Sequence, residues 1–171
     1  MVRKKKKKQP IDTPLAELLG EVLPNQRLLG LDLGTKTIGL AISDTGKSIA
    51  SPLETIQRTK FGKDAERLVA VCNEQEIGGF VLGLPRNMDG SEGPRAQATR
   101  DFYLSMRDFW KEHDLPVIPV TFWDERLSTV AVTRTLLDAD TSRARRGEVV
   151  DKMAASFILQ GALDRARNMQ S

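Results

Sequence analysis

The stretch that most limits the fold of this chain is residues 28–44, where one carboxylate interrupts an apolar segment just before a Gly-Thr-Lys turn. Residues 28–33 and 38–43 are rich in strand-forming types, and the short turn between them predicts an antiparallel pair. Asp32 stands inside the first strand. Burying an ionised carboxylate is prohibitive unless it is hydrogen-bonded, paired or bound to a metal. Its sequence neighbours supply no such partner, so the sequence predicts one from elsewhere in the fold.

The rest of the chain alternates between strand-like and helical patterns. A third strand-like run is followed by helical periodicity, and two more apolar runs each come after a helix. The predicted strands are residues 28–33, 38–43, 49–56, 80–84 and 117–123, and the predicted helices are 61–72, 95–111, 128–137 and 148–167, the last two around a basic loop at 143–147. The order βββαβαβαα predicts an α/β fold with a five-stranded mixed sheet, an antiparallel meander followed by parallel strands and flanked by helices.

The first ten residues differ from the rest in charge. They hold six cations and no acid, whereas the formal net charge of the whole chain is +3, so the remainder carries a net charge of −3. Residues 1–10 are therefore predicted to be a basic, disordered tail. A short appended helix is predicted within residues 11–24, where Thr13 and Pro14 suit a helix start, and a single folded domain at 25–168. The sequence has no membrane span and no secretory signal, which predicts a cytoplasmic protein.

Two further acids are predicted to lie near Asp32. Glu125 comes directly after strand 117–123, and ligands of open α/β sheets gather at such carboxyl ends. Asp151, in the predicted first turn of the last helix, shares a stripe with small alanines that faces the sheet. Each acid also has a simpler explanation, Glu125 as a partner of Arg126 and Asp151 as a first-turn acid favoured by the helix dipole. Together, however, three such acids would repel one another unless Mg²⁺ or Mn²⁺ lay between them.

Four segments resemble the YqgF family of the ribonuclease H-like superfamily, a family named for Holliday junction resolvases or pre-16S rRNA nucleases. They are LeuAspLeuGlyThrLysThrIleGlyLeuAlaIleSerAsp (31–44), GlyLeuProArgAsnMetAspGlySerGluGlyProArgAla (83–96), AspGluArgLeuSerThr (124–129) and AspLysMetAlaAlaSerPheIleLeuGln (151–160). The resemblance implies that Asp32, Glu125 and Asp151 are the catalytic, metal-binding acids. Two features depart from the family pattern: Arg86 stands where an apolar residue is common, and the lysine tail with its helix lies outside the pattern.

The resemblance implies a nuclease that processes the 5′ end of pre-16S rRNA during ribosome biogenesis, with structured RNA or ribosomal subunit precursors as partners. We expect hydrolysis with two Mg²⁺ or Mn²⁺ ions, roughly 3.5–4 Å apart, on either side of the scissile phosphate. Lys36, Arg95 and Arg126 are candidate phosphate contacts, and each is equally well explained as an ordinary surface or salt-bridging charge. The glycine-rich loop at 87–93 is expected to close over the substrate.

Three other functions are compatible with the sequence. The same acids could resolve Holliday junctions in branched DNA, and symmetric cleavage would then need a homodimer rather than a monomer. In a non-catalytic RNA-binding ribosome-assembly factor, the basic tail would dominate and the acids would bind structural metal. The turn after Asp32 also resembles the first phosphate loop of the ATP-binding sugar kinase and actin superfamily. Those proteins need two such domains and a second Asp-Gly loop, whereas this chain has AspGluArg at 124–126.

Overall fold

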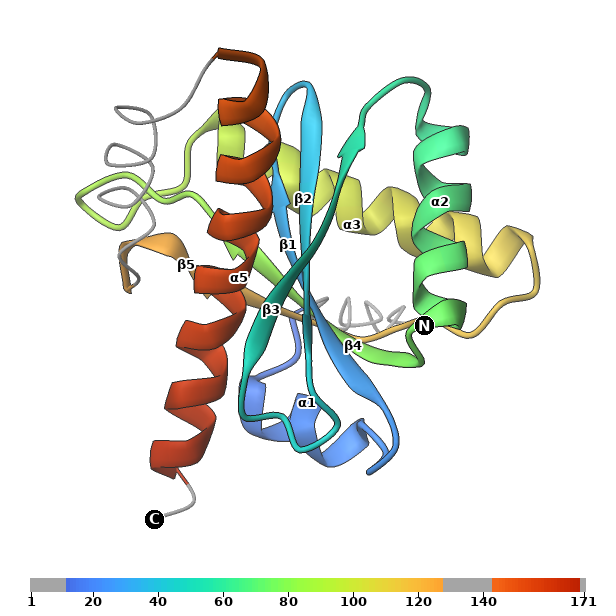
Figure 1. The fold of residues 1–171 in the computed structure, drawn as a ribbon, viewed down its shortest axis with the longest axis vertical. Coiled ribbons are helices and arrows are strands. Elements are labelled where there is room, and N and C mark those ends of the chain that lie inside the picture. Colours follow the sequence, from blue (N-terminus) through green and yellow to red (C-terminus); the bar gives the residue numbers. More distant parts are fainter. Residues whose placement is uncertain (1–11, 128–142, 170–171) are drawn as a thin grey trace, which may run out of the picture.

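The computed structural model describes residues 12–127 and 143–169, with the side chains of the last helix described from Asp151 onward. It contains a five-stranded sheet in the order β3-β2-β1-β4-β5 (Figure 1). The two antiparallel pairs join β1 (Arg27–Leu33) to β2 (Thr37–Ser43) and β2 to β3 (Ala50–Gln57). The two parallel pairs join β1 to β4 (Ile77–Leu84) and β4 to β5 (Val120–Asp124). The predicted meander followed by parallel strands is confirmed.

Helices cover both faces of this sheet (Figure 1). On one face α2 (Phe61–Glu74) and α3 (Pro94–Glu112) share a core with Leu29 and Leu31. On the other face α1 (Leu15–Glu21) and α5 (Arg143–Met169) share a core with Leu28. Because side chains alternate along a strand, Asp32 faces α5. None of the described helices is long and apolar enough to cross a membrane.

The start of α5 differs from the prediction. The predicted loop at 143–147 and helix start at residue 148 are wrong, because α5 begins at Arg143. Arginine and alanine are good helix formers, and a single glycine costs only about 1 kcal/mol in a helix interior. Asp151 therefore lies about two turns inside α5 rather than in its first turn, and the helix dipole no longer explains it. The predicted helix at 128–137 and the predicted tail lie outside the described residues.

The start of β5 also differs. The strand begins at Val120 rather than at Val117. Prolines at 116 and 119 explain the delay, because proline has no N–H to donate to a strand partner. The strand ends at Asp124, so Glu125 opens a short 3₁₀ turn (Glu125–Leu127) at the carboxyl end of the sheet. This end is shared by β1 and β4, which run parallel to β5.

The segment before α1 is attached to the outer edge of β5. Asp12 forms a parallel bridge with Val120, whose carbonyl oxygen accepts the N–H of Thr13 at 2.8 Å. The carboxylate of Asp12 accepts the N–H of Phe122 at 3.1 Å. In α1 itself, Leu18 is fully buried in the core that α5 shares. The helix predicted within 11–24 thus packs on the domain instead of projecting from it.

The carboxyl group of Asp12 should make the stability of the fold depend on pH. Burial raises the pKa of its carboxyl, against the opposing effects of the Phe122 hydrogen bond and of Arg100. A raised pKa in the folded state means that stability falls as the pH rises from the unfolded pKa through the folded one. We expect Asp12→Asn to increase the free energy of unfolding at about pH 7 by less than about 1 kcal/mol, since the group is only partly buried. Below about pH 3 it should change nothing. Urea unfolding at both pH values measures this, and equal effects at both would contradict it.

Candidate active site

The turn between β1 and β2 is held by hydrogen bonds at the carboxyl end of β1. The N–H of Gly34 donates to the carbonyl of Thr37 at 2.8 Å. The guanidinium of Arg58 donates to the carbonyl of Gly34 at 2.6 Å, and the N–H of Arg58 donates to the carbonyl of Lys36 at 2.9 Å. The residue that follows β3 therefore braces the turn that follows Asp32, so the side chains of this turn start from a fixed backbone.

Asp151 lies near Asp32 because α5 packs closely against a glycine of β2. Asp32 lies directly opposite Gly39 in the β1–β2 register. A Cβ atom on Gly39 would collide with the backbone carbonyl of Asp151, so α5 rests on β2 at this residue. The hydroxyl of Thr37, two residues before Gly39, donates to Oδ2 of Asp151. The two acids, far apart in sequence, thus lie at the same end of one β-strand pair.

A pocket of about 360 Å³ opens between these acids. Asp32 and Asp151 line it together with two predicted phosphate contacts, Lys36 from the turn and Arg95 from α3. Asp32 is buried, with 4% of its surface exposed, whereas Lys36 and Arg95 are exposed. Four of the six residues singled out from the sequence therefore share one pocket, in which Asp32 is buried and the two cations are exposed to solvent.

Glu125 lies beside this pocket and is not part of its lining. Leu31 of β1 is paired with Leu82 of β4. The residues that follow them, Asp32 and Gly83, therefore occupy equivalent positions on the two parallel strands. A Cβ atom on Gly83 would lie 2.9 Å from Oε1 of Glu125. The same position is in contact with Ile158 of α5, so the Glu125 carboxylate is on the α5 face of the sheet, one strand away from Asp32.

The donor chemistry of the pocket suits a hard divalent cation in part. The carboxylates of Asp32 and Asp151 and the hydroxyl of Thr37 are oxygen ligands of the kind that Mg²⁺ and Mn²⁺ take. Within residues 12–127 and 151–169, however, no three His, Cys, Asp or Glu side chains are grouped so that they could hold a metal ion. Two of the three predicted acids line the pocket, and the Glu125 carboxylate lies beside it, one strand away.

Arg126 also lies outside the pocket. Its guanidinium pairs with Asp124 at 2.7 Å, and this hydrogen bond lowers the pKa of the Asp124 carboxyl. It also donates to the carbonyl of Met88 at 3.3 Å, in the loop after β4. That loop is closed by the N–H of Asn87, which donates to the carbonyl of Ser91 at 2.9 Å. The salt-bridging explanation of Arg126 therefore agrees with its contacts, which connect this loop to the end of β5.

Two residues that hold the site, Thr37 and Arg58, do not stand out in the sequence. A threonine in a turn and an arginine after a strand are both common, so neither residue type stood out. The strand order does indicate the position of Arg58, because β3 runs antiparallel to β2 and ends near the turn between β1 and β2. Any polar residue directly after β3, such as Arg58, is carried to the edge where Asp32 lies.

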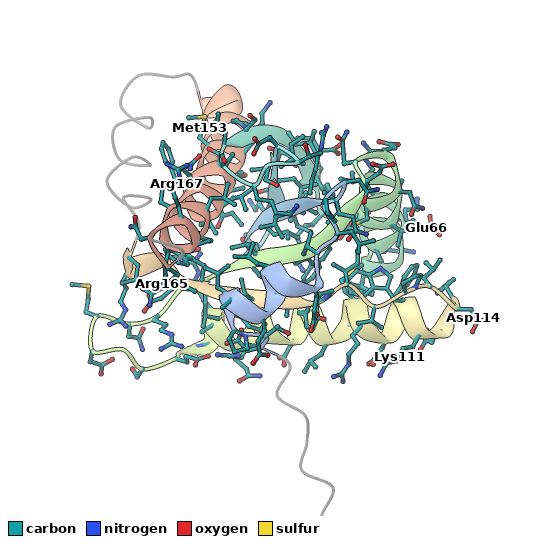
Figure 2. All side chains as sticks on the ribbon, turned by 90° about the horizontal axis from the view of Figure 1, so that it is seen from below. Glu66, Lys111, Asp114, Met153, Arg165 and Arg167 are labelled. Atoms are coloured by element: carbon teal, nitrogen blue, oxygen red, sulfur yellow. The ribbon has the colours of Figure 1, made fainter. Side chains whose placement is uncertain are left out.

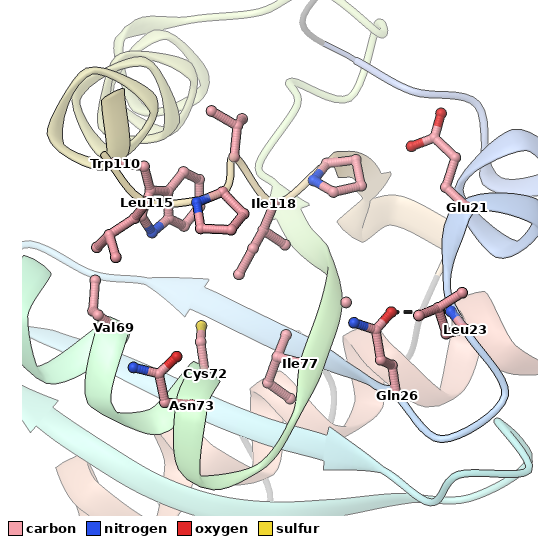
Figure 3. A pocket seen from close by; sticks show the side chains of 14 residues that line it. Glu21, Leu23, Gln26, Val69, Cys72, Asn73, Ile77, Trp110, Leu115 and Ile118 are labelled. Carbon is pink, nitrogen blue, oxygen red and sulfur yellow. Dashed lines mark hydrogen bonds between the residues drawn. The ribbon is translucent and has the colours of Figure 1, made fainter. Parts of the chain in front are cut away.

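A second hollow, of about 450 Å³, is not a candidate for this chemistry (Figure 3). It is lined largely by apolar residues, including Val69, Ile77 and Trp110. Cys72 also lines it, but burial raises the pKa of that thiol to about 12, so the reactive thiolate is scarce at neutral pH.

Comparison with known proteins gives one family match, two close relatives and one similar solved structure. The family model described as "RuvX: Holliday junction resolvase" matches residues 26–165. A protein of Paramagnetospirillum magneticum named "Putative pre-16S rRNA nuclease" is 60% identical over 155 residues, covering 91% of this chain and 96% of that protein. A protein of Roseobacter denitrificans with the same name is 62% identical over 146 residues, covering 85% and 87%. Among solved structures, T. thermophilus RuvC in complex with Holliday junction substrate aligns with a TM-score of 0.49 and 12% identity, over 82% of this chain and 96% of that one.

Proposed function

The chain belongs to the RuvX family, and from that premise we propose that it is a divalent-metal-dependent nuclease that processes the 5′ end of pre-16S rRNA. The observation that carries the proposal is the pocket in which Asp32 and Asp151 lie with Lys36 and Arg95. Paired carboxylates beside cations suit phosphodiester hydrolysis, because the acids hold metal and the cations offset their repulsion of the phosphate. The RNA substrate is inferred from relatives that share the name of pre-16S rRNA nuclease.

Each residue of the pocket has a distinct role in this proposal. Divalent ions, when bound, supply an activated water and stabilise the leaving oxygen. Asp32 and Asp151 hold those ions, and the hydroxyl of Thr37 orients the Asp151 carboxylate. Lys36 and Arg95 bind the phosphates on either side of the cleaved bond. Glu125 completes the acid set from the end of β5, once substrate and metal are bound.

The direct test uses the purified full chain with precursor 16S RNA and a four-way DNA junction, each with Mg²⁺, with Mn²⁺ and with chelator. We expect shortening of the 5′ end of the RNA that depends on the divalent ion. Preferential cleavage of the junction would favour the second candidate function, which rests on the family description as a Holliday junction resolvase. RNA binding without cleavage of either substrate, with any ion, would leave the assembly-factor alternative and reject the nuclease.

Lys36 and Arg95 can be tested separately from the acids. Replacing either by Gln should raise KM about five- to thirtyfold and change kcat less, since a phosphate contact contributes roughly 1–2 kcal/mol to substrate binding. Lys111→Gln, at the far end of α3, is the matched control because it removes the same charge from an exposed residue outside the pocket. Steady-state kinetics on the RNA measures both parameters. An unchanged KM in both pocket variants would remove these residues from substrate binding.

A further inference from the structure

A third hollow, of about 280 Å³, lies where the hairpin between β2 and β3 meets the last turns of α5. Two cations line it, Lys47 from the hairpin and Arg167 from α5, and no acid does. Thr37 and Ser43 mark the two ends of β2, so this hollow and the catalytic pocket lie at opposite ends of the same strand.

Lys47 occupies a backbone position that favours glycine. Its φ is +55°, in the left-handed region, which is unfavourable for a residue with a side chain. Its ammonium group donates only to backbone carbonyls, at 3.0 Å to Thr45 and 3.3 Å to Leu23. Among the described residues, Lys47 has no ion pair. The Lys47 ammonium therefore faces the hollow without a close ion pair among the described residues.

Arg167 is fixed to the same hairpin. Its guanidinium donates to the carbonyl of Ser48 at 3.2 Å, which uses one of its five N–H donors. Gln160, two turns earlier on the same stripe of α5, donates to Ser48 at 3.0 Å and accepts the N–H of Ala50 at 2.9 Å. These bonds hold the hairpin against α5, so that Lys47 and Arg167 line one hollow. Arg165, two residues earlier, lies on another side of α5 and lines a different hollow with Trp123 (Figure 2).

The acids near these cations accept hydrogen bonds from other groups, although the Asp44 carboxyl, whose pKa is lowered chiefly by the N–H groups of Ile49 and Ser48, also interacts with the Lys47 charge. The carboxylate of Asp44 accepts the N–H of Ser48 at 2.7 Å and of Ile49 at 3.0 Å, inside the hairpin turn. Asp164 accepts from the Gln160 amide at 2.9 Å. Neither carboxylate is among the residues that line the hollow, so the charged side chains of its lining are both cations.

We infer that Lys47 and Arg167 form a second phosphate site, which binds the backbone of a nucleic acid duplex whose cleaved bond lies at Asp32 and Asp151. At ~1.5 Å per residue, the axis of α5 from Asp151 to Arg167 is roughly 24 Å long. A duplex advances ~3.4 Å per base pair, so this span corresponds to about seven base pairs. This inference rests on the proposed function, because the duplex is anchored at the catalytic pocket. It adds the requirement that the substrate contain a duplex long enough to reach the second site.

The test measures binding by the full chain carrying Asp32→Asn, so that cleavage does not interfere. The probes are RNA and DNA duplexes extending either about four or about sixteen base pairs from a cleavable branch, at several salt concentrations. With Lys47→Gly and Arg167→Gln added, the long probes should bind roughly tenfold more weakly, with a salt slope smaller by about two. The short probes should be unaffected. Loss on RNA alone or on DNA alone would identify which duplex uses the site.

The matched control is Lys63→Gln with Lys111→Gln, which removes the same two charges from exposed positions on α2 and α3, on the other face of the sheet (Figure 2 labels Lys111). An equal loss in this control, or an equal loss on short probes, would overturn the site. Lys47→Gly relieves the left-handed strain, so a melting temperature at or above that of the parent shows that misfolding is not the cause. Length-dependent binding without any cleavage by the wild type would reject the proposed function alone. Cleavage with an unchanged salt slope would reject this site alone.

Discussion

Asp32→Asn and Asp151→Asn should each slow phosphodiester cleavage by about a thousandfold or more. An amide keeps the shape of the carboxylate but loses the charge that holds a divalent cation, and such cations contribute several kcal/mol of transition-state stabilisation. At 1.36 kcal/mol per factor of ten, that range corresponds to about three orders of magnitude. The double variant should be little slower than either single one, because residues that act as a unit lose their effect together. Single-turnover rates on the RNA precursor measure all three.

Two controls separate this loss from misfolding. Asp108→Asn removes an acid from an exposed position on α3, away from the pocket, and should keep the wild-type rate. Mn²⁺ should raise the melting temperature of the wild type and not of the two pocket variants, since a ligand stabilises only the state that binds it. Wild-type activity in both pocket variants would reject the proposed site. Glu125→Gln tests the third acid: full activity there would restrict the site to Asp32 and Asp151.

The sequence predicted those parts of the site that depend on strand periodicity. Alternation along residues 28–33 put Asp32 on the face opposite Leu29 and Leu31, and these two leucines lie in the core beneath α2 and α3. The stripe that Asp151 shares with Ala155 and Ile158 likewise faces the sheet, where both are fully buried. Both patterns repeat over several residues, so one uncertain boundary does not change the face on which a side chain lies.

The start of α5 was predicted wrongly, and two details of the site depend on contacts that no periodic pattern encodes. Arg143 to Gly147 contains both helix-forming residues and a glycine, so local propensity does not decide between loop and helix. Glu125 was predicted to join the other acids from its position after β5. Its distance from them depends on the 3₁₀ turn and on the contact with Gly83, which no periodic pattern encodes. Arg126 pairs with Asp124, two residues away, and its role as a phosphate contact stays a prediction.

Gly39→Ala should destabilise the fold and disable the site together. Its new Cβ would collide with the carbonyl of Asp151, a backbone atom of a long helix that cannot rotate aside, so α5 must move. Overpacking of this kind costs roughly 1–3 kcal/mol and occasionally more, and we expect the upper end of that range. A shift of about 1 Å at a catalytic group can cost a hundredfold in rate, so cleavage should fall by about that factor even where the variant is fully folded.

Substitutions at two other glycines show whether the loss of cleavage rate comes from misplacing Asp151 or from overpacking in general. Gly30 also contacts α5, where a Cβ would lie 2.7 Å from Cβ of Leu159, so Gly30→Ala should cost similar stability with a smaller loss of rate. Gly62, at the start of α2, has no atom within 4 Å of its Cβ position, and Gly62→Ala should be neutral or stabilising by up to about 1 kcal/mol. Urea unfolding and single-turnover rates on all three variants measure these effects. If Gly39→Ala and Gly30→Ala lose rate equally, the close approach at Gly39 holds α5 on the sheet without specifically positioning Asp151 beside Asp32.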